Sequence, residues 1–416
     1  MKKIIAIALT AALEIGMTAS MVNAAEEKDD LVLMITSSDD AFGEEIEQKL
    51  TEKFGDKYNL IFKPWETLSC DQAIKTASIA NEQLDIVQYW PGSMRNLVEA
   101  GTAMSLNDYM TDEWKAQFTT EDVLQQGTYD DNLYNLPYQS VYPVVVVNTD
   151  ITDELGITLS EDGQWSWAEF EELCEAAADA GIYGSTIQSD FTPWLSRMAI
   201  MEVWDTPEEV DAWNDGQVSF LDEKITGAFA DLKTFFDTDS LYPGADACLA
   251  QDADQTIAAF STGKAASIFT INSQVAGMLE NTDVENFIIM DWPNMGNNEN
   301  WPLLGGSSGL FIPSFAKNVD GALEVLQYLT GEECADIRAN AGAVSTIKTS
   351  DSVSVDADMM EALSRKTDAI VAHEIQHLTT EIDSAMNMMP ANYVLYGDES
   401  LEELETYRLD YVDTLE

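Results

Sequence analysis

The residues best suited to direct chemistry are His373 and His377, the only two histidines in the chain. With Glu374 between them they spell His-Glu-Ile-Gln-His, the HExxH pattern. On an α-helix this spacing places both imidazoles on one face, where they can bind zinc while the glutamate activates a zinc-bound water. The motif therefore raises the hypothesis of a zinc metalloprotease.

The surrounding sequence favours a different interpretation of this motif. Apolar residues recur at helical spacing and predict the buried face of a helix: Val371, Ile375, Leu378, Ile382 and Met386. At about 100° per residue, both histidines fall nearly opposite that face, beside Lys366, Glu381 and Ser384. A third zinc ligand would have to come from an unmarked acidic residue between Glu399 and Asp410. We therefore expect two solvent-facing histidines, with adventitious metal binding and a protease as alternatives.

Other catalytic arrangements have less support in the sequence. A serine or cysteine nucleophile would have to recruit one of the two histidines as its base. Gly263-Lys264 is followed by Ala265, so this segment is not a GK[S/T] phosphate loop. A glycosidase needs two carboxylates across a cleft, and the 75 acidic residues leave that open without marking a pair. We expect no catalytic residue, no cofactor and no metal, and hence a protein that is not an enzyme.

The cysteines bear on metal binding and on disulfides. Cys70, Cys174, Cys248 and Cys334 are widely spaced and form no CxxC pair, which argues against a structural zinc site. If all four were paired, three connectivities would be possible. Cys174 and Cys334 lie in helical patterns, and we expect at least two of the four to be buried thiols.

Length and charge narrow the class of protein. The chain has 416 residues, too many for one ordinary core, so two lobes are expected. It carries 20 Lys and Arg against 75 Asp and Glu, a net charge of −55. Such a surface repels phosphate backbones and anionic lipid head groups, so we expect no nucleic-acid partner.

The first 24 residues have the pattern of a secretory signal peptide. Met1-Lys2-Lys3 precedes the apolar run Ile4 to Leu13, which is too short to span a bilayer. Val22-Asn23-Ala24 then fits a small-x-Ala cleavage site. We expect residues 1–24 to be removed and the mature protein to be exported. The first cysteine is Cys70, so no lipobox cysteine follows this segment, and the protein is predicted to be periplasmic, extracellular or held at the cell surface by its partner.

Strands and helices alternate after this segment. Strands are predicted at 31–36, 58–63 and 84–90, with helices at 44–54 and 71–80 between them. This βαβαβ order predicts a parallel, doubly wound sheet, in which ligands bind at the carboxyl ends of the strands. Those ends carry Ser37-Ser38-Asp39, Trp65-Glu66 and Tyr89-Trp90.

Five segments, in order along the chain, resemble the extracellular solute-binding proteins of family 1, the sugar-binding components of ABC importers. They are Asp85 to Tyr109 with its Trp-Pro-Gly loop, Tyr134-Asn-Leu-Pro-Tyr138 with Val144 to Asp150, Trp165 to Leu173, Phe260 to Asn272, and Gly305 to Asn318. In the second segment Thr149 replaces the lysine usual in this family. The third begins a predicted helix with Ser166 as a plausible N-cap.

The resemblance implies a periplasmic binding protein fold of type II, with two doubly wound α/β lobes joined by three hinge crossings. The crossings are expected near residues 139–145, 269–273 and 310–314. The N-lobe would comprise residues 30–140 plus 271–311, and the C-lobe residues 141–270 plus 312–416. A monomer would then capture a mono- or oligosaccharide by hinge closure and deliver it to the membrane permease of an ABC transporter. A non-sugar solute or a role as a surface sensor is the alternative.

Sugar binding requires an aromatic face beneath the ring and planar polar groups around its hydroxyls. Residues of these kinds lie at predicted loop ends, and we expect the ligand site to include Asp39, Trp65, Glu66, Trp90, Tyr138, Trp194, Asn272, Trp301 and Gly306. Trp90 is the strongest candidate because it ends a strand and precedes a Pro-Gly turn.

Overall fold

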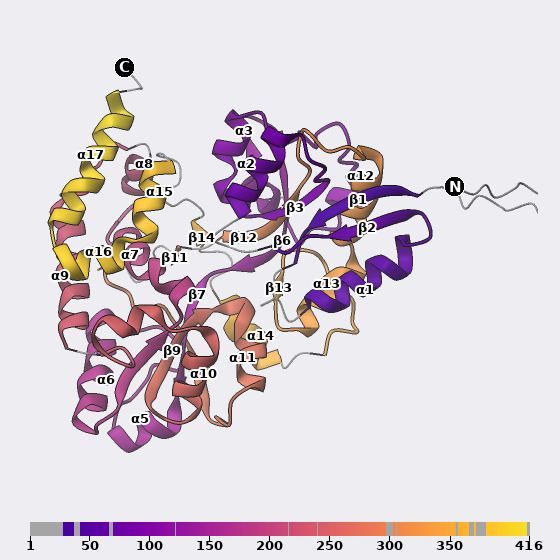
Figure 1. Cartoon of the computed structure of the whole chain (residues 1–416). Coiled ribbons are helices and arrows are strands. Elements are labelled where there is room, and N and C mark those ends of the chain that lie inside the picture. Colours follow the sequence, from indigo (N-terminus) through magenta and orange to yellow (C-terminus); the bar gives the residue numbers. More distant parts are fainter. Residues whose placement is uncertain are drawn as a thin grey trace, which may run out of the picture.

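The structure is a computed structural model, and each of its two lobes is built around its own sheet (Figure 1). It describes residues 28–36, 42–65, 70–120, 122–214, 216–238, 240–296, 303–304, 306–354, 357–365, 370–371 and 380–413. We call the lobe around the six-stranded sheet the first lobe and the lobe around the four-stranded sheet the second lobe.

The sheet of the first lobe mixes strands from three parts of the chain. Its order is β13 (Val344–Ser345), β6 (Asn135–Val141), β12 (Gly306–Phe311), β3 (Ile86–Tyr89), β1 (Asp29–Met34) and β2 (Tyr58–Phe62). Strand β1 is parallel to β2 and β3, as the βαβαβ pattern predicts. Strand β12 is antiparallel to both β3 and β6, so β3 and β6 run in the same direction.

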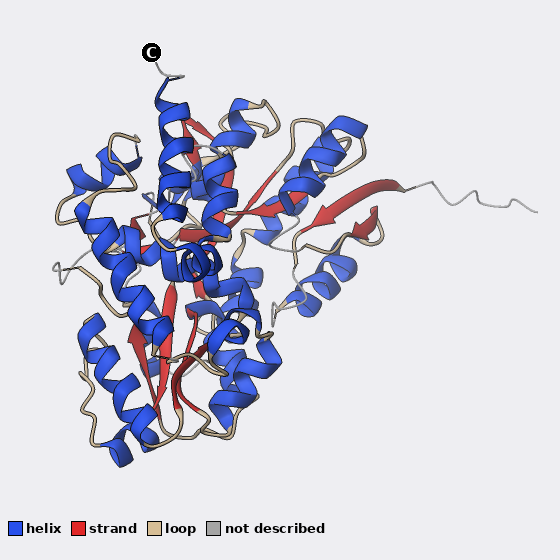
Figure 2. Ribbon diagram, turned by 60° about the vertical axis from the view of Figure 1, so that its left-hand side comes forward, coloured by secondary structure: helices blue, strands red, loops and turns tan. Residues whose placement is uncertain are grey.

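Helices cover both faces of this sheet (Figure 2). They are α1 (Gly43–Phe54), α2 (Cys70–Ala80), α3 (Arg95–Glu99), α4 (Asp112–Lys115), α12 (Val319–Leu329) and α13 (Glu332–Asn340). Helix α1 buries Ile46, Leu50 and Phe54, the predicted apolar stripe, against one face together with α12 and α13. Helices α2 and α3 pack on the other face through Ile74 and Leu97.

A buried carboxylate holds the chain segment that leads into β3. Asp85 is fully buried, and its two oxygens accept four hydrogen bonds. The donors are the backbone N–H of Val32 and the side chain of Gln83, each at 2.8 Å, and the backbone N–H groups of Lys317 and Asn318 at 2.9 and 3.0 Å. Asp85 thereby links β1 to the chain that enters α12.

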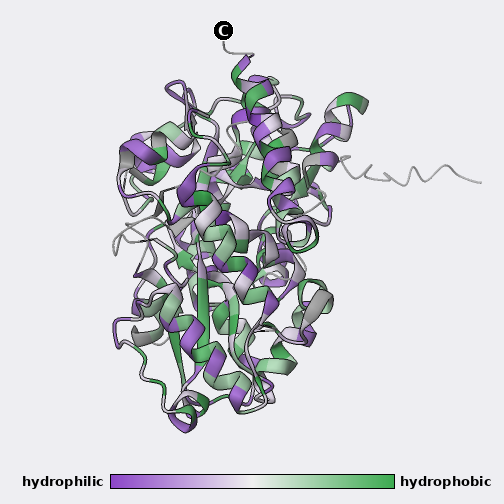
Figure 3. Ribbon diagram, turned by 90° about the vertical axis from the view of Figure 1, so that its left-hand side faces the viewer, coloured by the Kyte–Doolittle hydropathy of each residue, from purple (hydrophilic) through white to green (hydrophobic). Residues whose placement is uncertain are grey.

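The sheet of the second lobe has the order β10 (Phe287–Asp291), β7 (Pro143–Asn148), β9 (Ala265–Ile271) and β8 (Tyr183–Ile187). Strand β7 is antiparallel to β9 and β10, and β8 is parallel to β9. Val144 to Val147 are fully buried because both faces of β7 are covered, which explains the unbroken aliphatic run. Figure 3 shows the hydrophobic colouring along these central strands.

The helices of the second lobe come from two separate stretches of chain. The first stretch supplies α5 (Thr149–Leu155), α6 (Trp167–Asp179), α7 (Thr192–Met201), α8 (Pro207–Asn214), α9 (Glu223–Asp237), α10 (Ala253–Ser261) and α11 (Val275–Glu280). The second supplies α14 (Ala357–Ser364), α15 (Thr380–Asn387), α16 (Met389–Tyr396) and α17 (Glu399–Asp413). Helix α6 begins with a capping box in which Ser166 and Glu169 bond reciprocally, so the predicted N-cap is confirmed.

Short elements complete the described chain. The 3₁₀ turns are η1 (Pro91–Ser93), η2 (Asp122–Gly127), η3 (Ser189–Phe191), η4 (Ala245–Ala250) and η5 (Asn272–Gln274). Two small ribbons pair β4 (Thr128–Tyr129) with β5 (Asn132–Leu133) and β11 (Leu303–Leu304) with β14 (Ile370–Val371).

The chain passes between the lobes at places that only partly match the prediction. The first crossing is at Tyr142, between β6 and β7, inside the predicted range 139–145. The second lies between β10 and β12, and the third between β13 and α14. The crossings expected at 269–273 and 310–314 are wrong, because β9 leads through α11 to β10 of the same sheet and β12 leads to α12 on its own lobe.

These crossings also correct the predicted lobe boundaries. Residues 275–291 belong to the second lobe, since β10 pairs with β7 along its whole length. Residues 319–345 belong to the first lobe, where α12 and α13 pack on its sheet and β13 pairs with β6. The first lobe is therefore built from residues 29–141 and 306–345, and the second from 143–291 and 357–413.

The helix predicted around the HExxH motif is found in part. Ile382 and Met386 lie on α15 and are buried in the second lobe, as the stripe predicts. Val371 instead lies in strand β14, paired with Leu304, so the expected continuous helix from 371 is wrong. His373, Glu374 and His377 lie outside the described residues, as does the predicted signal peptide.

The described helices are all too short or too polar to cross a membrane. All four cysteines are buried thiols. Burial raises the pKa of the Cys174 thiol to about 12 and also raises that of Cys334.

Candidate functional site

Strand directions determine which edge of the first sheet meets the second lobe. Strands β3 and β6 are parallel, so their carboxyl ends lie at the same edge. Strand β6 continues through Tyr142 into β7, so this edge faces the second lobe. Trp90, which follows β3, and Gly306, which begins β12 opposite Val141, both lie at this edge.

The second sheet presents a matching edge. Strand β7 begins there, and its antiparallel partners β9 and β10 end there, with Pro143 opposite Ile271 and Val144 opposite Asp291. Strand β8 is parallel to β9 and ends at the same edge. The carboxyl ends of strands from both lobes therefore face each other across the crossings. Figure 1 shows the two lobes on either side of the connection from β6 to β7. This is the arrangement in which open α/β sheets bind ligands.

An aromatic pair occupies the edge of the first sheet. The rings of Trp65 and Trp90 are 5.5 Å apart at an interplanar angle of 67°. Trp65 is buried, and its indole N–H donates to the carbonyl of Gln88 at 2.8 Å, which fixes the ring. Trp90 is only half-buried, so part of its indole remains exposed. The structure thus brings together two of the predicted ligand residues.

The turn after Trp90 is held in place by Tyr129. The Tyr129 hydroxyl donates to the carbonyl of Pro91 at 2.6 Å and accepts the backbone N–H of Met94 at 3.1 Å. Burial raises the pKa of this phenol to about 12, so it stays protonated and able to donate at neutral pH. The Trp-Pro-Gly loop is therefore tied to the ribbon formed by β4 and β5.

Two predicted ligand residues prove to be deeply buried. Tyr138 is 1% exposed, and the guanidinium of Arg338 lies 4.2 Å from its ring centroid within the first lobe. Asn272 is fully buried beside the first crossing, where its amide bonds to backbone groups. Both lie near the facing edges, but their side chains are engaged inside the protein.

The other predicted residues have varied surroundings. Trp194 is half-buried on α7 and packs against the core of the second lobe. Gly306 has open space where a Cβ would stand, so its backbone is approachable. Asp39, Glu66 and Trp301 lie outside the described residues.

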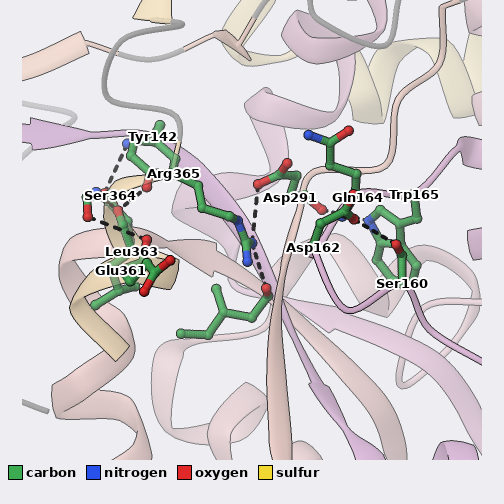
Figure 4. A network of polar contacts seen from close by, with 12 residues as sticks. Tyr142, Ser160, Asp162, Gln164, Trp165, Asp291, Glu361, Leu363, Ser364 and Arg365 are labelled. Atoms are coloured by element: carbon green, nitrogen blue, oxygen red, sulfur yellow. Dashed lines mark hydrogen bonds and ion pairs between the residues drawn. The ribbon is translucent and has the colours of Figure 1, made fainter. Parts of the chain in front are cut away.

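A polar network in the second lobe was not predicted (Figure 4). The guanidinium of Arg365 donates to the carbonyl of Ile289 at 2.7 Å and lies 3.4 Å from the carboxylate of Asp291. Gly163 has a φ of +74° and packs directly on the guanidinium, where a Cβ would lie 2.3 Å from its central carbon. The sequence signal for this network was a glycine, Gly163, in an acidic turn. The sequence could not show that this glycine packs on the distant Arg365.

The same network extends along the 160–165 turn. The indole N–H of Trp165 donates to the carbonyl of Asp291 at 2.6 Å. Donation by the Ser160 hydroxyl and by the Gln164 backbone N–H lowers the pKa of Asp162 below its ordinary value. These contacts fix the end of β10, where it leaves for the second crossing.

The described residues contain no group of three or more His, Cys, Asp or Glu side chains placed to hold a metal ion. The sequence also contains a second catalytic pattern, because Gly305-Gly-Ser-Ser-Gly309 matches the Gly-x-Ser-x-Gly elbow of hydrolases. Such an elbow needs a strand-to-helix turn, whereas Ser307 lies within β12 opposite Ser140, is 2% exposed and donates to Gln126 at 2.5 Å. This serine is a buried sheet residue.

Comparison with known proteins gives a family match and structural neighbours. The model of the family described as bacterial extracellular solute-binding protein matches residues 35–335. No curated relative matches in sequence. The fold is similar to that of a chitin oligosaccharide binding protein, with a TM-score of 0.77 at 15% identity over 92% of this chain and 100% of the other.

Two further solved structures are similar over nearly their whole length. The GacH receptor of Streptomyces glaucescens, studied unliganded and with acarbose, has a TM-score of 0.75 at 16% identity, covering 94% of this chain and 99% of that one. The solute-binding protein RafE in complex with raffinose has a TM-score of 0.73 at 16% identity, covering 92% and 99%. At these identities the similarity establishes the type II binding-protein fold.

Proposed function

Because the chain belongs to the bacterial extracellular solute-binding protein family, we propose that it captures a carbohydrate between its two lobes and delivers it to an ABC importer. The proposed ligand is a mono- or oligosaccharide, and the protein acts by binding alone, without chemistry. The observation that carries the proposal is the aromatic pair Trp65 and Trp90 at the edge of the first sheet that faces the second lobe.

The aromatic pair suits a pyranose because such a ring presents an apolar C–H face that stacks on an indole. Trp65 is immobilised by its bond to Gln88 and supports Trp90 edge-on, so the exposed indole is held before any ligand arrives. A preordered aromatic surface binds at a lower entropic cost than a mobile one. The sugars named for the structural neighbours, which are chitin oligosaccharide, acarbose and raffinose, agree with this ligand class.

The connection of the lobes supports capture by closure. Each lobe has its own core, and within the described residues the chain crossings and the packing around them join the facing edges. A solute that touches both edges binds the closed arrangement better than the open one and shifts the population towards closure. The importer's permease would then recognise the closed form of an exported, monomeric protein.

Isothermal titration against a panel of carbohydrates tests the proposal. The panel contains xylo-, chito-, malto- and raffinose-type sugars, with amino acids, peptides and polyamines as the other classes. We expect one carbohydrate group to bind at a stoichiometry of one, with quenching or enhancement of tryptophan fluorescence. Binding of a different solute class, with every carbohydrate silent, would refute the sugar assignment.

A further inference from the structure

The first crossing is held by an unusual reciprocal pair. The backbone N–H of Tyr142 donates to the side-chain oxygen of Asn272 at 3.0 Å, and the backbone N–H of Asn272 donates to the carbonyl of Tyr142 at 3.0 Å. Asn272 follows directly after Ile271, which is paired with Pro143. The pair therefore extends the β7–β9 ladder by one step, with a side-chain amide in place of a backbone carbonyl.

The same two residues also bind the chain that arrives from the third crossing. The amide nitrogen of Asn272 donates to the carbonyls of Ser140 at 3.3 Å and Leu363 at 3.4 Å. The Tyr142 hydroxyl also donates to the Leu363 carbonyl, and Figure 4 shows these two residues. Leu363 is near the carboxyl end of α14, where helix carbonyls lack helical partners. Side chains at the first crossing thus cap the helix at which the third crossing ends.

Apolar packing joins the same segments. Val344 lies in β13, the last strand of the first lobe before the third crossing, and it pairs with Ser140. It packs in one buried cluster with Tyr142 and Leu363. The third crossing therefore starts and ends beside the first one. Just beyond Leu363, Arg365 bonds to β10 of the second lobe and fixes this end of α14 a second time.

We propose that Asn272 is a positioning residue that joins the first and third crossings into a single hinge and so sets the balance between the open and closed lobes. We call Tyr142, Asn272 and Leu363 the hinge cluster. If the crossings moved independently, the lobes would sample more orientations, and a ligand would have to offset that entropy on closing. A joined hinge restricts the lobes to opening and closing. The effect on ligand affinity rests on the proposed function, whereas the effect on lobe orientation does not.

The chemistry of this position suits asparagine. Its amide supplies one acceptor for the Tyr142 N–H and donors for two carbonyls, all from a fully buried side chain. Aspartate would keep the acceptor but lose both donors. Alanine would leave the Tyr142 N–H and the Ser140 carbonyl without these partners in a site that water does not reach.

Distances between the lobes of the full-length, ligand-free protein test the hinge. Ile79 on α2 and Leu395 on α16 are 88% and 64% exposed, so Ile79→Cys and Leu395→Cys give one label site on each lobe. The native cysteines are buried and remain unlabelled. We expect Asn272→Ala to broaden the distance distribution measured by electron spin resonance. The matched control is Asn281→Ala, because Asn281 is exposed and bonds only locally to Gly277 at the end of α11.

Two further variants separate the contributions of the individual hydrogen bonds in the hinge cluster. Tyr142→Phe keeps the ring in its apolar cluster and removes the hydroxyl that donates to Leu363. Asn272→Asp keeps the acceptor and removes the donors to Ser140 and Leu363. Each should broaden the distribution less than Asn272→Ala. With a carbohydrate that binds the parent protein, Asn272→Ala should raise the Kd at least about fivefold, since the binding-competent state is less populated.

The outcomes distinguish the hinge from the proposed function. Parent-like distances in folded Asn272→Ala, or equal broadening in Asn281→Ala, would overturn the proposal. If Asn272→Ala fails to fold, Tyr142→Phe decides, with broadening supporting the hinge and parent-like distances refuting it. If no carbohydrate binds the parent protein, the proposed function fails while the distance measurement still decides the hinge.

Discussion

Trp90 and Asn272 make the most instructive comparison in this molecule. Both follow a strand at the edge where the two lobes face each other, and both were predicted to contact ligand. Trp90 is half-buried, with an indole surface left exposed beside Trp65. Asn272 is fully buried, and its amide bonds to the backbone of Tyr142, Ser140 and Leu363.

The difference shows that position at a strand end does not decide a role by itself. A side chain can recognise a solute only with atoms that the protein has left available. Where burial and internal hydrogen bonds engage every polar atom, the same topological position stabilises the fold or its hinge instead. Substitution of a residue whose side chain is available should therefore change ligand affinity. Substitution of a residue whose polar atoms are all engaged should change stability or lobe orientation.

The largest expected effect is on stability at Asp85, a residue with fully engaged polar atoms. Asp85→Ala removes four hydrogen bonds and leaves one buried and two partly buried backbone N–H groups without this acceptor, so it should lower the free energy of unfolding by about 3–5 kcal/mol. Urea denaturation followed by circular dichroism measures this loss. Asp85→Asn, which keeps one acceptor oxygen, should be milder. If a folded Asp85→Asn protein lost ligand affinity but no stability, Asp85 would act in ligand binding and not in the fold.

The next largest effect is on affinity at Trp90. Removing the indole in Trp90→Ala should weaken carbohydrate binding by about 100-fold, close to 2.7 kcal/mol, because a stacked aromatic contact is lost at the centre of the site. Titration calorimetry measures the Kd, and thermal unfolding should shift little. Tyr109→Ala is the matched control, since Tyr109 is a 43% exposed aromatic of the same lobe outside the facing edges. Unchanged affinity in Trp90→Ala would show that the Trp90 indole does not bind the ligand.

The smallest effect is expected far from the crossings, at Glu405 on α17. Its carboxylate accepts from Arg408 at 2.6 and 2.8 Å and from the backbone N–H of Phe220 at 2.9 Å. Burial alone would raise the pKa of Glu405, but these hydrogen bonds outweigh it and lower that pKa below its ordinary value. Glu405→Gln should therefore cost about 1.5 kcal/mol of stability at neutral pH and leave ligand affinity unchanged.

The pH dependence follows from the direction of the Glu405 shift. A carboxyl group with a lowered folded-state pKa stabilises the fold above its unfolded pKa, near 4.3, and loses that contribution as pH falls through the folded value. The difference between the parent protein and Glu405→Gln should then be largest at neutral pH and vanish in stronger acid. A difference that grows as pH falls would have the wrong sign for this ion pair.

The local part of the fold could be predicted from the sequence. Periodicity correctly placed α1 with Ile46, Leu50 and Phe54 inside, and the βαβαβ order placed β1, β2 and β3 in one parallel sheet. The first crossing was implied by the resemblance of the Leu136-Pro-Tyr138 segment, and of the valine run after it, to the solute-binding protein family. These features depend on residues close in sequence, whose patterns carry the information directly.

The partners of strands distant in sequence could not be predicted in this way. Whether β10 joins the first or the second sheet depends on pairing with β7, more than a hundred residues earlier, and nothing local to Phe287–Asp291 encodes that choice. The ion pair between Arg365 and Asp291 also joins residues far apart in the sequence, and no local pattern predicts it. For the candidate site, residue type and strand ends selected Trp65 and Trp90, whose rings lie side by side in the structure. Burial, which separates Trp90 from Asn272 and Tyr138, is a property of the assembled fold.

The place of β12 in the first sheet has a consequence for how the protein forms during synthesis. Strand β12 lies between β3 and β6, so a nascent chain that has delivered residues 29–141 still lacks the middle of its sheet. The core of the second lobe likewise stays incomplete until Ile382, Tyr393 and Leu401 have been synthesised, because these residues pack against helices made much earlier. Pairings of such long sequence separation form slowly. Neither lobe can be completed until late in translation, and a fragment cut at the first crossing should aggregate through its open strand edges rather than fold.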